Sequence, residues 1–385
     1  MLKLDALLWI NLLTQAYWLL SFGYLLLFAT LGYYWLRKEQ DYAPLSPLPP
    51  LSLVIAIRNE AANLPALFQH LHQLSYPSLE VLLVDDHSED ESLQLLQQAV
   101  QDALVAGKDW RLLQATGQGK KAAISTALAV AKGEIIVTTD ADCSFGTDWL
   151  ERLTAPFTND KIQLSAGPVM SAPLPEYVLN TFQQVDWASI LLVTRLSFSI
   201  GSPFMCNAAN MAYRKSAFEQ VNGYHGNNHF LSGDDEFLLK KIISTYGKAS
   251  AKYSHQPQLL VRTQPQKSWA EFLSQRARWA SKWRSHDFKH VLVAAMPSFV
   301  LLLYLLSPFL LLLGKAGGLA FAGLWVMKIV SEYWVVAAVM RSFGIRFNLA
   351  QMIIASCMHP FYALATALTI GQKNWEWKGR KQASL

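Results

Sequence analysis

A long uncharged segment at the start of the chain constrains its fold most strongly. Residues 7–36 contain no charged side chain, and a helix needs only ~20 apolar residues to cross a bilayer. The segment lacks a small-residue cleavage site, which favours a retained anchor over a signal peptide. Tyr33, Tyr34 and Trp35 precede Arg37 and Lys38, an interfacial pattern that predicts a cytoplasmic position for residue 40. We therefore expect residues 1–40 to form an N-terminal transmembrane anchor.

Three further apolar segments, residues 291–313, 317–340 and 349–370, lie near the other end. The chain is 52% hydrophobic and 16% charged, against about 25% charged residues in ordinary soluble domains. These features predict an integral membrane protein with C-terminal membrane helices over residues 291–371. Three spans would place the basic tail, residues 372–385, outside, against the positive-inside rule. Either one segment is re-entrant or interfacial, or the charge rule does not hold here.

Residues 51–264 alternate between short β-branched runs and helical patterns, after a proline-rich linker at residues 41–50. We expect strands at 51–57, 79–86, 110–115 and 134–139, and helices at 63–74, 92–104 and 119–133. This alternation predicts an α/β domain with a mostly parallel, doubly wound sheet. Ligands of such sheets bind beyond the carboxyl ends of the strands. Three polar clusters fall at that edge: residues 58–60, 85–88 and 140–142.

Asp140 and Asp142 follow the fourth expected strand as an Asp-Ala-Asp sequence. Residues two apart in an extended chain point the same way, and paired carboxylates suit Mg²⁺ or Mn²⁺. An acidic turn is the alternative. The position at the end of a buried strand favours the metal site.

Two other acidic clusters have structural and chemical interpretations. Asp85 and Asp86 precede Ser88, which could cap a helix, but their carboxylates could also accept from a nucleobase N–H. Asp234 and Asp235 open a helical segment, where the dipole favours acids. Packing acids together raises at least one pKa, which suits a general base. A solvated helix start is the alternative.

Residues 265–290 form an expected amphipathic helix that contains Gln275-Arg-Ala-Arg-Trp279. Aromatic side chains recur on one face at Trp269, Phe272, Trp279 and Trp283, and basic residues occupy much of the rest. We expect Trp269, Phe272 and Trp283 to anchor this helix at the membrane interface. Gln275, Arg278 and Trp279 could instead contact a ligand, because arginine pairs with phosphate and indoles stack on sugars.

The charge and cysteine patterns exclude some classes. The net charge of +5 is concentrated near residues 265–290 and nothing resembles a nucleic-acid module, so we expect no nucleic-acid partner. Cys143, Cys206 and Cys357 are scattered without metal-type spacing, and we expect reduced thiols with a packing role for Cys143.

The four motifs, in the order VDDHS, TTDADC, GDDEFL and QRARW, resemble membrane-bound family-2 glycosyltransferases of the GT-A fold. That group includes hyaluronan, chitin, cellulose and poly-N-acetylglucosamine synthases and ceramide glucosyltransferases. The resemblance covers roughly residues 50–290 and implies a GT-A, Rossmann-like catalytic domain. Many members have Glu-Asp where this chain has Asp234-Asp235. The spacing to Leu238 aligns Asp235 with the residue that is the general base in that family.

The resemblance also implies site roles. Asp86, with Asp85, would bind the base of a nucleotide sugar, most often uracil, and Glu60 and Lys120 would border the nucleotide. Asp140 and Asp142 would hold the diphosphate through Mg²⁺ or Mn²⁺. Asp235 would be the general base, and Asp234, Gln275, Arg278 and Trp279 would line the diphosphate and acceptor site.

These roles imply an inverting, metal-dependent hexosyltransferase that moves a sugar from a UDP-sugar to a membrane-associated lipid or glycan. We expect it in a bacterial inner membrane with a cytoplasmic catalytic domain. The alternatives are a non-catalytic membrane module that binds nucleotide sugars or scaffolds a partner synthase, and a transporter. No acid of the motif set is missing, which disfavours both.

Two questions stay open at this stage. Lys328 and Glu332 lie four residues apart inside an apolar segment, where charges pair with each other or mark a function. We favour a structural pair over a role near the acceptor, and a kink over a site at His359-Pro360. The small C-terminal membrane region favours a lipid acceptor or a short product over an exported polymer.

Overall fold

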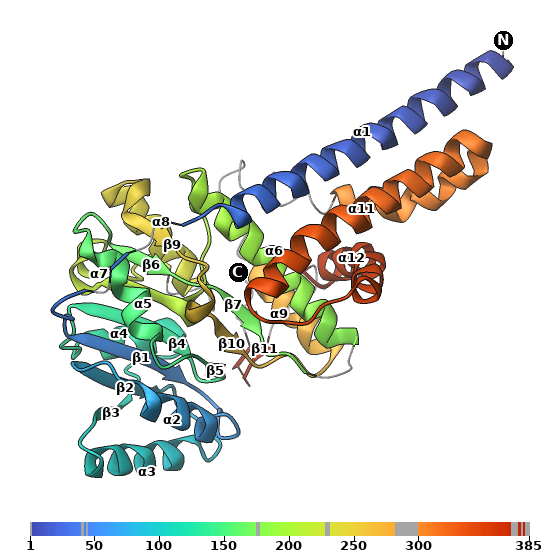
Figure 1. Cartoon of the computed structure of the whole chain (residues 1–385). Helices are drawn as coiled ribbons and strands as arrows, with labels where there is room; N and C mark the ends of the chain where they lie inside the picture. The colour runs from blue at the N-terminus through green and yellow to red at the C-terminus, as the bar shows by residue number, and fades with distance from the viewer. Residues whose placement is uncertain are drawn as a thin grey trace.

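The computed structural model describes residues 2–39, 42–43, 45–174, 178–227, 232–281, 299–370, 376–378 and 380–381. An α/β domain forms one end of the molecule, and long apolar helices extend away from it (Figure 1). The expected boundaries between an anchor, a catalytic domain and a C-terminal membrane region stay a prediction.

The central sheet has seven strands in the order β3-β2-β1-β4-β8-β6-β9. Strands β1, β2, β3 and β4 are mutually parallel, whereas β8 runs antiparallel to both β4 and β6. The mostly parallel sheet is thus confirmed. The strand bounds are Leu51–Ile57 (β1), Leu79–Asp85 (β2), Asp109–Gln114 (β3), Ile135–Asp140 (β4), Leu164–Ala166 (β6), Met211–Arg214 (β8) and Ala251–Tyr253 (β9).

Helices connect the parallel strands as the alternation predicts. They are Leu64–Gln73 (α2), Ser92–Val105 (α3) and Lys120–Leu128 (α4). The expected end of the third helix at Gly133 is wrong, because α4 already ends at Leu128. Gly133 serves the packing instead: a Cβ there would lie 2.3 Å from the backbone nitrogen of Ser52 in β1. Only glycine allows this close approach of the two chains.

The second half of the domain is built on a smaller sheet and several helices. Strands β5 (Cys143–Ser144), β10 (Val261–Thr263) and β7 (Val169–Ser171) form that sheet in this order. The helices are Trp149–Thr154 (α5), Val178–Ser199 (α6), Lys215–Gln220 (α7), Asp234–Tyr246 (α8) and Trp269–Ser281 (α9). Helix α6 was not predicted, and it runs between the α/β domain and the apolar helices (Figure 1).

Among the described residues, three helical segments are long and apolar enough to cross a membrane: Leu8–Leu36, Phe299–Ser342 and Leu349–Thr369. They contain α1 (Leu2–Leu36), α11 (Gly314–Ser342) and α12 (Leu349–Ile370). Helices α1 and α11 lie side by side (Figure 1). Residues 299–306 are helical and continue as a 3₁₀ helix, η6 (Ser307–Leu313).

The segment 299–313 folds back against the start of α11. Gly314 turns the chain with a positive φ of 70°, and the Trp325 indole donates to Ser307 Oγ at 3.0 Å. Residues 291–298 lie outside the described part of the chain. A re-entrant first segment, one of the two alternatives above, stays a prediction.

The Lys328–Glu332 pair lies buried where α1, α11 and α12 meet. Glu332 also accepts hydrogen bonds from Tyr24 of α1 and Ser356 of α12. These contacts join three helices through one carboxylate and support the structural interpretation of the pair.

One residue of the aromatic face of α9, Phe272, does not lie at the membrane interface as expected. Phe272 is fully buried and stacks on Tyr362 of α12, with ring centroids 5.5 Å apart. Trp269 is half-buried against Phe182 of α6. The interfacial role is therefore wrong for Phe272, because α12 and α6 cover this face. Trp283 lies outside the described residues.

Candidate active site

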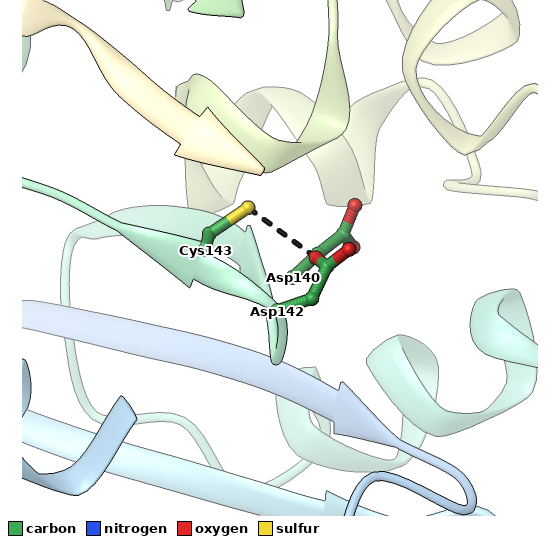
Figure 2. A group of neighbouring side chains, drawn as sticks. All are labelled: Asp140, Asp142 and Cys143. Atoms are coloured by element: carbon green, nitrogen blue, oxygen red, sulfur yellow. Dashed lines mark hydrogen bonds between the residues drawn. The ribbon is translucent and has the colours of Figure 1, made fainter. Parts of the chain in front are cut away.

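Asp140 and Asp142 lie together at the carboxyl end of β4. Strand β4 ends on Asp140, and a tight turn carries the chain to β5, which begins at Cys143 (Figure 2). Ligand atoms of Asp140, Asp142 and Cys143 all lie within 4.8 Å of one another. The two carboxylates therefore share one small volume, as the sequence predicts, but the turn after Asp140 brings them together and not an extended chain.

The electrostatics of this cluster favour an oxygen-ligand cation site. Burial raises the pKa of Asp142 to about 6, and the neighbouring charge of Asp140 adds to that shift. Thr263 Oγ1 donates to Asp142 at 2.8 Å and holds the carboxylate in place. Burial also raises the pKa of the Cys143 thiol, which donates to Asp142 at 3.6 Å (Figure 2). A protonated thiol is a poor ligand, so the two carboxylates are the candidate ligands.

Lys120 connects this cluster to the second acidic cluster. Its Nζ lies 2.6 Å from Asp140 and 3.1 Å from Asp234. Burial opposes the charge of Lys120, but the two carboxylates outweigh it and raise the lysine pKa. The lysine therefore stays charged between two segments that are far apart in the sequence.

Asp234 and Asp235 occupy the first turn of α8. Gly233 precedes them with a left-handed φ of 87°, a backbone conformation that glycine adopts freely. Burial opposes ionisation of Asp234, yet Lys120 lowers its pKa, so the raised pKa expected in this cluster does not fall on Asp234. Half-buried Asp235 accepts from the backbone nitrogens of Ala208 at 3.3 Å and Glu236 at 2.6 Å.

A cavity of about 710 Å³ unites these residues, a size typical of small-molecule sites. Nine residues that the sequence singled out line it: Glu60, Lys120, Asp140, Asp142, Asp234, Asp235, Gln275, Arg278 and Trp279. Asp85 and Asp86 do not belong to this lining.

The two acids at the end of β2 instead organise nearby loops. The Asp86 carboxylate accepts from Gly119 N at 3.1 and 3.0 Å, and thereby fixes the start of α4 beside Lys120. Asp85 accepts from Ser88 N at 3.2 Å and from the Gln114 amide at 3.0 Å. Binding of a nucleobase by either residue stays a prediction.

Helix α9 presents one face to the cavity and another to α6. Burial lowers the pKa of Arg278, while the acids around it, Asp234 first, oppose that shift. Arg276 points to the other side, where its Nε donates to Asp186 of α6 at 2.7 Å. The Arg276 guanidinium also lies 4.2 Å from the centroid of the Trp279 ring. The sequence analysis missed the pair of Arg276 and Asp186, because α9 supplies the arginine and α6 supplies the acid.

Lys378 is a second residue that sequence reasoning missed. The C-terminal segment brings it into the cavity lining, where its Nζ pairs with the Glu60 carboxylate. The Arg58 Nε donates to the Lys378 carbonyl at 3.2 Å. The basic composition of the tail was noted, but nothing in it identified one lysine as a neighbour of Glu60.

An α/β domain with acidic clusters around one cavity agrees with the known proteins that this chain resembles. Residues 52–221 match the sequence model of glycosyl transferase family 2. The glycosyltransferase AglE of Haloferax volcanii is 26% identical over 238 residues, which are 60% of this chain and 72% of that protein. The chain is therefore a glycosyltransferase with a GT-A fold. Specifically, residues 52–221 are similar to glycosyl transferase family 2.

Two further proteins, one compared by sequence and one by structure, are similar to this chain. The β-monoglucosyldiacylglycerol synthase of Trichormus variabilis is 33% identical over 117 residues, 30% of this chain but only 25% of that protein. The mannosyltransferase PcManGT from Pyrobaculum calidifontis, solved with GDP-Man and Mn²⁺, has a TM-score of 0.59 at 18% identity. That structural match covers 94% of this chain and 99% of the other, and it supports the fold. With its three candidate spans, the chain is a membrane protein.

Proposed function

We propose that this protein transfers a sugar from a nucleoside diphosphate sugar, a UDP-sugar in the first instance, to a membrane-associated acceptor with inversion. The observation that carries the proposal is the convergence of Asp140, Asp142, Asp235 and Arg278 on one cavity. A paired-carboxylate site, a separate carboxylate and a cation are the groups that such a transfer needs.

Asp140 and Asp142 would hold Mg²⁺ or Mn²⁺. Burial, and after it the charge of Asp140, raises the pKa of Asp142. A divalent cation would relieve this repulsion, and the carboxylate oxygens are ligands that a hard cation prefers. When bound, the metal would neutralise charge on the departing diphosphate and act as a Lewis acid. The solved complex of PcManGT with GDP-Man and Mn²⁺ is consistent with this assignment.

Lys120 and Arg278 would bind and orient the diphosphate. Both carry positive charge within the cavity, and Lys120 already contacts Asp140. Charge-assisted hydrogen bonds from such groups are stronger than neutral ones. Glu60 would border the nucleotide. Asp86, with Asp85, would bind the nucleobase at the edge of the sheet.

Asp235 would act as the general base. It would take the proton from an acceptor hydroxyl as the hydroxyl oxygen attacks the anomeric carbon from the face opposite the diphosphate. The bond between that carbon and the diphosphate oxygen breaks, and the nucleoside diphosphate leaves. The backbone nitrogens of Ala208 and Glu236 hold the carboxylate at a fixed orientation.

We place the catalytic domain on the cytoplasmic side of a bacterial inner membrane. Arg37 and Lys38 after the first apolar segment support that orientation.

A donor panel tests this function. Purified full-length protein with Mn²⁺ or Mg²⁺ is given UDP-glucose, UDP-galactose, UDP-N-acetylglucosamine and GDP-mannose, and release of nucleoside diphosphate is measured. We expect turnover of at least one donor, abolished by a metal chelator. Binding of a donor without any turnover would instead support the non-catalytic module.

A further inference from the structure

One wall of the cavity is apolar and belongs to the helix that the sequence did not reveal. Trp187, Ile190, Leu191 and Thr194 of α6 all line the cavity. Their spacing of three, four and seven residues places them on one face of a helix. Phe204 and Met205, in the loop after α6, extend the same wall.

The hydroxyl proton of Thr194 is not available to a ligand of this wall, because it is donated to the Ile190 carbonyl at 2.8 Å. The Trp187 indole packs against Trp279, with ring centroids 5.4 Å apart, and against the Arg276 guanidinium. Oligosaccharide sites need hydrogen-bonding partners for many hydroxyl groups. A wall of leucine, isoleucine, phenylalanine and methionine is suited to hydrocarbon instead.

Helix α6 also connects the cavity to the membrane region. It packs against α1, α11 and α12. Arg195 of α6 pairs with Glu39 at 3.1 Å and donates to the Tyr34 carbonyl at 3.3 Å. These partners lie where α1 leaves its apolar stretch, so the apolar wall lies next to the expected membrane surface.

The loop after α6 leads from this wall to the proposed base. Phe204, Met205, Cys206 and Asn207 all line the cavity, and the next residue, Ala208, donates its backbone N–H to Asp235. An acceptor lying along α6 would therefore present its polar end to Asp235.

We propose that the wall formed by Trp187, Ile190, Leu191, Phe204 and Met205 binds the hydrocarbon chain of a lipid acceptor. The acceptor hydroxyl then lies at Asp235, and the chain runs along α6 towards the membrane. This assignment rests on the proposed transferase function and selects a lipid over a glycan acceptor.

A series of acceptors with one head group tests it. Glycerol 1-alkyl ethers from butyl to hexadecyl are compared with free chito- and cello-oligosaccharides, using the donor that the panel identifies. We expect kcat/KM to rise up to about fourfold per methylene until the wall is filled, and the oligosaccharides to be inactive. No donor turnover at all would refute the transferase function. Turnover with oligosaccharides in preference to long alkyl ethers would overturn the lipid assignment alone.

Photolabelling gives a readout that does not depend on the head group. A hexadecanol with a terminal diazirine is irradiated with the protein in nanodiscs, and labelled peptides are mapped. We expect label in residues 187–206, reduced at least tenfold by Ile190→Asn. Val193→Asn is the matched control, since Val193 is on the same helix, 37% exposed and outside the cavity lining. Equal labelling in both variants would contradict the assignment.

Discussion

The Nζ of Lys120 lies 3.1 Å from the carboxylate of Asp234, so one lysine joins the start of α4 to the start of α8. The same ammonium lies 2.6 Å from Asp140. The paired carboxylates of β4 and the acidic turn of α8 thus form one charged unit around the cavity, although the sequence presents them as separate motifs.

Replacing Lys120 tests whether this unit binds the donor. Lys120→Met keeps the length of the side chain but removes a charge-assisted hydrogen bond of about 1.5–3 kcal/mol. We expect affinity for the nucleoside diphosphate to fall by roughly ten- to hundredfold in titration calorimetry. Lys132→Met is the control, because Lys132 is largely exposed, lies outside the cavity lining and pairs with exposed Asp109 at 3.2 Å. If both variants bind the nucleoside diphosphate with equal affinity, Lys120 does not contribute to the donor site.

Removing one carboxylate of the Asp140–Asp142 pair tests the metal site. Asp142→Ala should lose metal-dependent donor binding by at least roughly 10–100-fold, the range found for groups that only support metal ligands. Binding is measured with and without Mn²⁺. Asp148→Ala serves as the control, since Asp148 is a half-exposed acid paired with Arg152 a few residues later. If Asp142→Ala keeps its Mn²⁺ response, the pair is an ordinary acidic turn.

The buried ion pair between Asp186 and Arg276 should support α9. Asp186→Asn would leave Arg276 buried without a counter-charge, a change that costs about 3–5 kcal/mol at buried sites. We expect a lower thermal unfolding temperature in detergent. Asp160→Asn, at a fully exposed position near Arg214, should leave that temperature unchanged. An unaltered temperature for Asp186→Asn would show that α9 is held by its aromatic contacts alone.

Glu60 and Lys378 should act as a unit in the cavity lining. We expect Glu60→Gln and Lys378→Met to lower kcat/KM to a similar extent, and the double variant to be no worse than either. A double-mutant cycle then gives a coupling of about 0.5–3 kcal/mol, as for residues in direct contact. Additive losses would mean that the contact between them does not contribute to the function.

Much of the fold could be predicted because local patterns determine it. The β-branched run at 51–57 became β1 with the expected bounds, and the ends of β2 and β4 positioned the acidic clusters. Helix α6 was missed because its apolar residues serve two sides, a cavity wall and a helical bundle, which blurs the usual amphipathic period. Gly133 was misread as a helix end because its real constraint, contact with β1, is a tertiary one.

The residues of the candidate site could be predicted better than the partners that they contact. Nine of the eleven expected residues line one cavity, because parallel strands gather their carboxyl ends at one edge. The partners Lys378 for Glu60 and Gly119 for Asp86 were not predictable, and neither was the pair of Asp186 with Arg276 that holds α9 against α6. Each of these contacts depends on how distant segments pack, and no local pattern encodes it.

The most direct test of the proposed chemistry is a comparison of donor binding and sugar transfer in Asp235→Asn. The substitution removes the proton acceptor but keeps the side-chain shape. We predict that transfer falls by about 10²–10⁴-fold, while donor affinity in the presence of Mn²⁺ stays as in the wild type. Glu219→Gln, at an exposed position on α7, should change neither. Transfer at the wild-type rate by Asp235→Asn would contradict the assignment of Asp235 as the general base.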